Sequence, residues 1–171
     1  GCLDEMASVL EQQPDLAAVG CTQLNGDGQF IDGLGDAYHA SGHAWRKGYG
    51  KPVSAGLPGG RISASFSPCG AVSLYRTQAF NQVGGFDADF FCFFEDVDLA
   101  FRLRLQGWRF CQANHAIAHH IGGVSAKPRS ETAAYYGHRN MTVTFVKNMP
   151  MGLLLAMLPM HLLVSAAALI R

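Results

Sequence analysis

The sequence predicts an α/β fold, in which helical and strand-like segments mix along one domain at residues 1–148. Two observations support this prediction. Residues 2–12 carry apolar side chains at helical spacing, and residues 16–24 form the short apolar run that is typical of a buried strand. Segments of both kinds then continue without a linker-like boundary. An apolar segment at residues 149–171 follows the domain.

The composition excludes several classes of protein. Hydrophobic residues make up 49% of the 171 residues and charged residues 15%, which indicates a globular core rather than disorder. Thirteen acidic residues balance thirteen basic ones, so we expect no nucleic-acid partner. The five cysteines show no zinc-binding pattern. They favour free thiols in a reducing, cytoplasmic compartment.

The first half of the chain begins with the helix at residues 2–12, which Pro14 closes. The strand at residues 16–24 leads into the turn signal Asn25-Gly26-Asp27-Gly28. Residues 33–60 are rich in Gly, His, Ala and Ser and have little periodicity, which predicts a long loop. The chain opens inside its first helix without a signal-peptide pattern, which suggests a fragment of a longer protein.

The middle of the chain contains a strand-like stretch at residues 61–76, broken at residues 68–70 by Pro-Cys-Gly. A short helix follows at residues 77–83, and Gly84-Gly85 ends it. Residues 86–94 then form an aromatic loop.

The second half contains a helix at residues 95–106, capped by Gly107. Residues 108–118 read as one strand or two short strands that end in His119-His120. A second long helix is expected at residues 130–148.

The C-terminal apolar segment has no Asp, Glu, Lys or Arg between residues 149 and 170. That length could cross a bilayer, whereas Pro150 and Pro159 argue against a straight span. Lys147 and Arg171 flank the segment, where they could meet lipid head groups. A buried, an interfacial and a transmembrane helix all fit these observations. We therefore expect a cytoplasmic protein that either stays soluble or is peripheral to, or anchored at, the cytoplasmic face of a membrane.

The helix at residues 95–106 carries the densest cluster of acids. Glu95, Asp98 and Arg102 share one helical face, and the order of Asp98 and Arg102 favours an ion pair. Asp96 points elsewhere, toward the apolar positions Leu99, Ala100 and Leu103. Two interpretations remain open for Asp96: it caps the helix N-terminus, or it is a partly desolvated carboxylate that serves as a general base.

A resemblance adds to this reading. The motif Phe-Phe-Glu-Asp-Val-Asp-Leu-Ala-Phe-Arg at residues 93–102 follows Val-Gly-Gly-Phe-Asp at residues 83–87 and precedes Gly-Trp at residues 107–108. This combination resembles the signature of family-2 glycosyltransferases, especially their rhamnosyltransferase-like branch. Other segments of the chain resemble the family as well: residues 70–72 with Arg76 and Ala79-Phe80, residues 116–125, and residues 135–140.

The resemblance covers roughly residues 3–150 and implies a truncated GT-A fold, a Rossmann-like nucleotide-diphospho-sugar transferase with a mixed sheet and flanking helices. It implies the acceptor-side part of an enzyme that transfers a sugar, with inversion, from a nucleotide-sugar donor to a glycan or lipid-linked acceptor. The family's Asp-x-Asp-like metal motif would lie before Gly1, so we expect this chain alone to be inactive. The resemblance gives no prediction of oligomeric state.

The resemblance also implies roles for individual residues. Asp96 would be the general base that takes the proton of the acceptor hydroxyl, and Glu95 would help to bind the acceptor. The small residues Gly70 and Ala71 would let a substrate approach closely. Arg139 either neutralises substrate charge or is structural.

His119 and His120 are the candidate metal-binding residues, since the family often uses a histidine here to complete the shell of a divalent cation, Mg²⁺ or Mn²⁺. Strand phase from Ile117 would point His119 inward, whereas the spacing to Gly122-Gly123 favours His120. The alternative is that both are surface or hydrogen-bonded histidines.

Two other classes of function compete with sugar transfer. One is a non-catalytic carbohydrate-binding or assembly domain on the same fold. The other is a metal-dependent hydrolase that uses Asp96, Asp98 and His119, although the two aspartates diverge on a helix.

Overall fold

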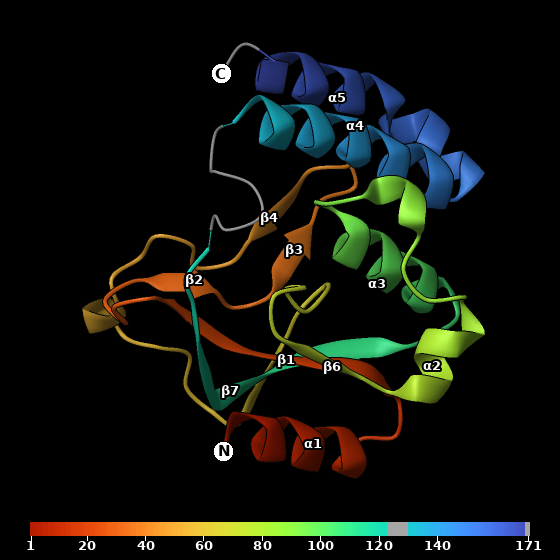
Figure 1. Ribbon diagram of the computed structural model, residues 1–171. Helices are drawn as coiled ribbons and strands as arrows, with labels where there is room; N and C mark the ends of the chain where they lie inside the picture. The colour runs from red at the N-terminus through yellow and green to blue at the C-terminus, as the bar shows by residue number, and fades with distance from the viewer. Residues whose placement is uncertain (123–129, 170–171) are drawn as a thin grey trace.

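The computed structural model describes residues 1–122 and 130–169. Two long parallel strands, β1 (Leu16–Asn25) and β7 (Arg109–His120), form the centre of a mixed sheet (Figure 1). All of β1 except Asn25 is buried, as its apolar run predicts. The predicted α/β fold with a mixed sheet and flanking helices is confirmed.

Three short strands complete this sheet. β2 (Ile31–Gly33) and β6 (Ser73–Tyr75) pair antiparallel with β1, and β5 (Ile62–Ala64) pairs antiparallel with β7. The predicted strand at residues 61–76 is therefore two separate strands that pair with different partners. The predicted break at residues 68–70 lies between them.

Helices cover both faces of the sheet (Figure 1). On one face, α1 (Cys2–Gln12) buries Met6 and Val9 against β1 and β7. On the other face, α2 (Thr77–Gln82) and α3 (Glu95–Leu105) bury Ala79, Leu99 and Leu103. Each large apolar side chain buried in this way contributes roughly 1.5–3 kcal/mol. The two layers fix α3, and with it the acidic motif, against the sheet.

The expected long loop at residues 33–60 is wrong in part. It contains an antiparallel hairpin of β3 (Asp36–Tyr38) and β4 (Ala44–Arg46), as well as a 3₁₀ turn, η1 (Val53–Ala55). Strands of three residues are too short to show periodicity in a sequence. A contact distant in sequence helps to hold this hairpin, since the backbone N–H of Asp36 donates to the Ser67 carbonyl.

The remaining sequence predictions agree with the structure in type and nearly in bounds. The aromatic loop contains one short turn, η2 (Ala88–Phe90), and the long helix is α4 (Glu131–Asn148). The predicted strand at residues 108–118 is the single strand β7, which begins at Arg109, includes both histidines and bulges between Ala113 and Ile117 opposite β1. The histidine-and-glycine segment lies outside the described residues from Gly123 onward.

The C-terminal helix α5 (Met151–Leu169) lies beside α4 (Figure 1). Its side chain His161 is 2% exposed, stacks on the Phe145 ring at 4.1 Å between ring centroids, and bonds the Ser41 carbonyl through Nδ1 at 2.8 Å. Most of the helix is nonetheless exposed. The stretch Met151–Ala168 has a mean hydropathy of 1.9. By length and composition alone, it is long and apolar enough to span a membrane.

Candidate functional site

A cleft of about 710 Å³ opens beside the carboxyl end of β7. The β3–β4 hairpin, the start of α3 and the turn of α4 at Gly137 also border it. All of the predicted site residues except Arg139 line this cleft, namely Gly70, Ala71, Glu95, Asp96, His119 and His120. The structure therefore brings together residues that lie as much as 50 positions apart in the sequence.

Asp96 lies in the first turn of α3, half-buried in the cleft wall. Its Oδ2 accepts a 2.7 Å hydrogen bond from the Gly70 backbone N–H, and its Oδ1 accepts one of 2.8 Å from Val97 N–H. The N-cap of α3 is Phe94, which makes no side-chain capping bond. Asp96 is therefore not the N-cap residue itself, but its Oδ1 does satisfy a free N–H group of the first turn, as the capping interpretation expects. Its Oδ2 also joins α3 to the segment at Gly70, so the capping and general-base interpretations both remain open.

Burial raises the pKa of Asp96 above its usual range, while the backbone N–H groups of Gly70 and Val97 oppose the shift. The neighbouring Glu95 has a raised pKa as well, first because of burial and then because of the charge on Asp96. Among the residues that the structure describes, no group hydrogen-bonds the buried Glu95 Oε2. A buried oxygen of this kind favours a ligand that donates a hydrogen bond.

The backbone before α3 is strained. Phe91, Phe93 and Phe94 have φ values of 60°, 64° and 67°, a region in which each non-glycine residue costs about 1–3 kcal/mol. The fully buried Asn140 holds this segment, because its Nδ2 donates to the carbonyls of Phe90, Cys92 and Phe93 at 2.8–2.9 Å. Asn140 therefore fixes the segment that presents Glu95 and Asp96.

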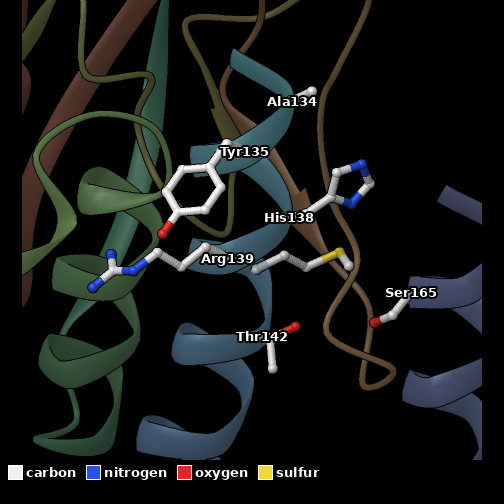
Figure 2. Close-up of a pocket in the computed structure, with 7 residues that line it drawn as sticks. Ala134, Tyr135, His138, Arg139, Thr142 and Ser165 are labelled. Carbon is white, nitrogen blue, oxygen red and sulfur yellow. The ribbon is translucent and has the colours of Figure 1, made fainter. Parts of the chain in front are cut away.

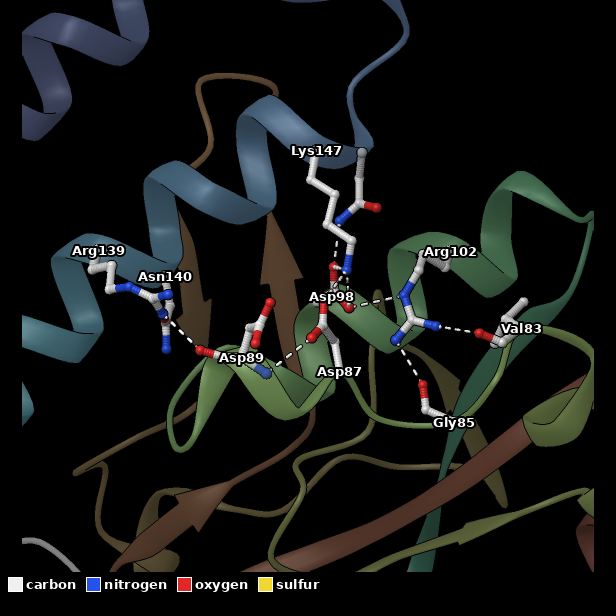
Figure 3. Close-up of polar contacts among 10 residues, drawn as sticks. Val83, Gly85, Asp87, Asp89, Asp98, Arg102, Arg139, Asn140 and Lys147 are labelled. Atoms are coloured by element: carbon white, nitrogen blue, oxygen red, sulfur yellow. Dashed lines mark hydrogen bonds and ion pairs between the residues drawn. The ribbon is translucent and has the colours of Figure 1, made fainter.

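Arg139 is the predicted site residue that does not line the cleft. Its Nη1 donates to the Asp89 carbonyl at 2.8 Å and to Asn140 Oδ1 at 2.7 Å (Figure 3). These contacts orient the Asn140 amide and tie α4 to η2. The observed contacts of Arg139 thus correspond to the structural alternative.

Asp36 is a cleft residue that the sequence reasoning missed. Its side chain is 7% exposed and its Oδ2 accepts a hydrogen bond from Ser67 Oγ at 3.1 Å. Burial raises the pKa of Asp36 to about 7, and the charge on Asp96 acts in the same direction. No sequence signal could have found it, because it lies in a three-residue strand within the aperiodic stretch.

The two histidines differ in their surroundings. His120 is half-buried, and its Nδ1 lies 2.8 Å from Asp32 Oδ2, an oxygen that Arg46 Nη1 also contacts at 2.8 Å. His119 is exposed. Its imidazole packs over Gly28, where an added Cβ would lie 3.0 Å from His119 Cε1.

The phase argument that turned Ile117 and His119 inward is wrong, since Ile117 is 43% exposed. Ala116 is instead the buried residue at this point of β7. The irregularity in β7 between Ala113 and Ile117 accounts for the change. Three extra residues of β7 lie there between the partners of two consecutive residues of β1, Cys21 and Thr22, and an odd number of extra residues reverses the alternation of the faces.

No cluster of three or more metal-ligating side chains occurs within residues 1–122 and 130–169. Two imidazoles and the carboxylates of Asp36, Glu95 and Asp96 line the cleft without forming such a cluster. The carboxylate that His120 contacts, Asp32, is already paired with Arg46. Divalent cations such as Mg²⁺ prefer several oxygen ligands. The described residues alone therefore do not fit a complete cation site.

The other acid of the motif, Asp98, is fully buried in an ionic cluster that joins α3 to α4 (Figure 3). Its carboxylate accepts hydrogen bonds from Arg102 Nε and Asn148 Nδ2, each at 2.8 Å, and forms an ion pair with Lys147 Nζ at 3.0 Å. The predicted ion pair of Asp98 with Arg102 is confirmed. Asp98 does not line the cleft, which counts against a hydrolase site shared with Asp96.

The sequence is similar to those of known proteins. The family model described as "Glycosyltransferase like family 2" matches residues 1–142. The chain is 28% identical over 150 residues to an N-acetylglucosaminyl-diphospho-decaprenol L-rhamnosyltransferase of Mycobacterium tuberculosis, covering 80% of this chain and 48% of that protein. It is 33% identical over 129 residues to the O-antigen biosynthesis protein RfbC of Myxococcus xanthus, covering 69% of this chain and 10% of RfbC. The chain thus spans about half of the first relative and much less of the second.

Proposed function

This chain belongs to glycosyltransferase family 2, and we propose on that premise that the full-length protein transfers a sugar from a nucleotide-diphospho-sugar to a glycan or lipid-linked acceptor. Two relatives named for rhamnosyl transfer and O-antigen biosynthesis support this substrate class. The observation that carries the proposal is the Asp96 carboxylate, held in the cleft wall by the Gly70 N–H.

Asp96 acts in this proposal as the general base. The acceptor hydroxyl loses its proton to Asp96 while its oxygen bonds to the anomeric carbon of the donor sugar. The bond from that carbon to the diphosphate oxygen breaks, and its electron pair leaves with the nucleotide diphosphate. Attack from the face opposite the leaving group inverts the anomeric configuration.

The environment of Asp96 suits this role. A general base works best when its pKa lies near the operating pH, and burial raises the pKa of Asp96 in that direction. Each carboxylate oxygen accepts one backbone hydrogen bond and keeps a lone pair for the acceptor proton. The two N–H groups also hold the carboxylate in one orientation.

Other cleft residues bind the acceptor and donor. Glu95 has a buried oxygen without a described partner, which suits an acceptor hydroxyl. Gly70 and Ala71 are small residues that line the cleft, so they would let a substrate approach closely. His119 and His120 would contact the donor diphosphate or supply an imidazole to a divalent cation, Mg²⁺ or Mn²⁺, whose other ligands come from outside the described residues.

We propose that this reaction takes place at the cytoplasmic face of a membrane, and the exposed apolar surface of helix α5 supports this proposal. The helix carries exposed apolar side chains along its length, including Met151, Leu155 and Leu163. His161 anchors its middle to the domain, and α5 lies along α4, which carries charged residues. A helix docked in this way suits the interfacial plane better than a span, because a span would carry α4 into hydrocarbon.

The experiment is a transfer assay with the full-length protein, a panel of nucleotide sugars and added Mg²⁺ or Mn²⁺. We expect transfer from at least one donor, and a product whose anomeric configuration by NMR is opposite to that of the donor. Binding of a glycan without transfer from any donor would instead identify a carbohydrate-binding or assembly domain.

A further inference from the structure

A second concavity, a groove of about 430 Å³, lies between α4 and α5 (Figure 2). Ala134, His138, Met141 and Thr142 of α4 form one side, and Ser165 of α5 borders the other. The wall is almost entirely apolar. A groove of this volume is in the range of small-molecule sites, although the mechanism proposed above does not use it.

The groove and the cleft adjoin along one turn of α4. Gly137 lines the cleft, and its neighbours on the helix surface, Ala134 and Met141, line the groove. A Cβ added at Gly137 would meet nothing within 4 Å, so packing does not require a glycine here. Glycine is unfavourable inside a helix relative to other residues. Because Gly137 has no side chain, the part of α4 that separates the cleft from the groove, here called the ridge, stays low at this residue.

The surroundings of the groove favour an apolar ligand. Helix α5, which forms one side, also exposes Leu162 and Leu163 by 60% and 66%. The Arg139 side chain borders the groove as well, but its Nη1 already donates to the Asp89 carbonyl and to Asn140 Oδ1. It also lies on the other side of α4 from Gly137, two residues earlier, so the path from the cleft depends on the apolar wall and not on this charge.

We propose that the groove binds the apolar chain of a lipid-linked acceptor, which leaves the cleft across Gly137. The inference rests on the proposed function, since it requires that the acceptor hydroxyl lies at Asp96. The sugar of the acceptor then occupies the cleft, its phosphate linkage passes over Gly137, and its isoprenoid or alkyl chain lies between α4 and α5.

Gly137→Leu tests this path, because the new side chain raises the ridge while favouring the helix. In the full-length protein we expect KM for a long-chain polyprenyl-diphosphate acceptor to rise about tenfold or more relative to KM for a short-chain acceptor. The thermal midpoint should not fall. The matched control is Gly152→Leu in α5, where an added Cβ also meets nothing within 4 Å, and it should leave both KM values unchanged. An unchanged KM ratio in Gly137→Leu overturns the path.

A photoreactive long-chain isoprenoid diphosphate gives a readout that does not need sugar transfer. We expect it to label peptides of α4 and α5, and unlabelled polyprenyl diphosphate to suppress the labelling. Equal suppression by phosphatidylglycerol vesicles would show that the groove takes bulk lipid and would overturn the inference. A dimer whose α4 and α5 peptides are not labelled would also overturn the inference, because a second copy of the chain would then cover the groove. Labelling in a protein that transfers no sugar would instead refute the proposed function and leave the lipid site standing.

Discussion

The carboxylate of Asp96 is held at 2.7 Å by the backbone N–H of Gly70, 26 residues earlier in the chain. This contact joins the start of α3 to the opposite wall of the cleft. It stabilises the ionised carboxylate while burial disfavours it, so the position and the protonation of Asp96 both depend on the segment at Gly70.

Gly70→Ala should therefore impair catalysis. A Cβ at residue 70 would lie 3.1 Å from Asp96 Oδ2, which is too close unless the carboxylate moves. We expect kcat to fall roughly 10- to 100-fold, since small misplacements of a reacting group cost rate steeply. The measurement is steady-state transfer by the full-length protein. Wild-type kcat in this variant would show that the contact does not position the base.

Asn140→Ala should destabilise the fold. The change removes the donor that holds three carbonyls of the strained segment before α3. We expect a loss of about 2–4 kcal/mol in the free energy of unfolding, measured by urea denaturation. Asn81→Ala is the control, because Asn81 is an exposed residue of α2 and should change stability by less than about 0.5 kcal/mol. Equal effects of the two changes would contradict this role.

Asp36 should make stability depend on pH. Its pKa is raised from 3.8 to about 7 in the folded state, so the folded chain binds a proton that the unfolded chain has lost. The resulting stability is complete below about pH 4 and is lost as pH rises through about 7. Asp36→Asn stays uncharged and lacks this dependence. Between pH 4 and pH 8 we expect the wild type to lose roughly 1–4 kcal/mol relative to the variant. Unfolding curves that shift in parallel for both proteins would rule this out.

His161→Ala should loosen α5. The substitution removes the stacking on Phe145 and the bond to the Ser41 carbonyl, and it leaves a cavity between α5 and the domain. We expect faster amide hydrogen exchange along α5, while α1 and α3 keep their protection. Leu162→Ala is the matched control, since Leu162 is 60% exposed. If both variants exchange like the wild type, the anchor is not His161.

The sequence predicted those parts of the site that lie on regular elements. Helical periodicity predicted α3, and the resemblance of its motif singled out Asp96. Asp36 was not predicted as a site residue, because its strand has only three residues and depends on a contact with Ser67. Asn140 stood inside a recognised motif, but its role depends on positive φ angles that no spacing of residues reveals.

The histidines show a further limit. Counting alternate residues along β7 assumes an unbroken pairing with β1. The bulge after Ala113 breaks that pairing and exposes Ile117. The three extra residues of β7 leave no mark in one sequence, so the direction of His119 could not be obtained by counting.

The most direct test of the central claim is sugar transfer by full-length Asp96→Asn. Asparagine has the same size and can still accept the hydrogen bond from Gly70, but it cannot take a proton from the acceptor. We expect kcat to fall by roughly 10²- to 10⁴-fold, with donor binding retained and a wild-type thermal midpoint. Transfer at the wild-type rate would contradict the account, because Asp96 would then be a structural link between α3 and Gly70 and not the base.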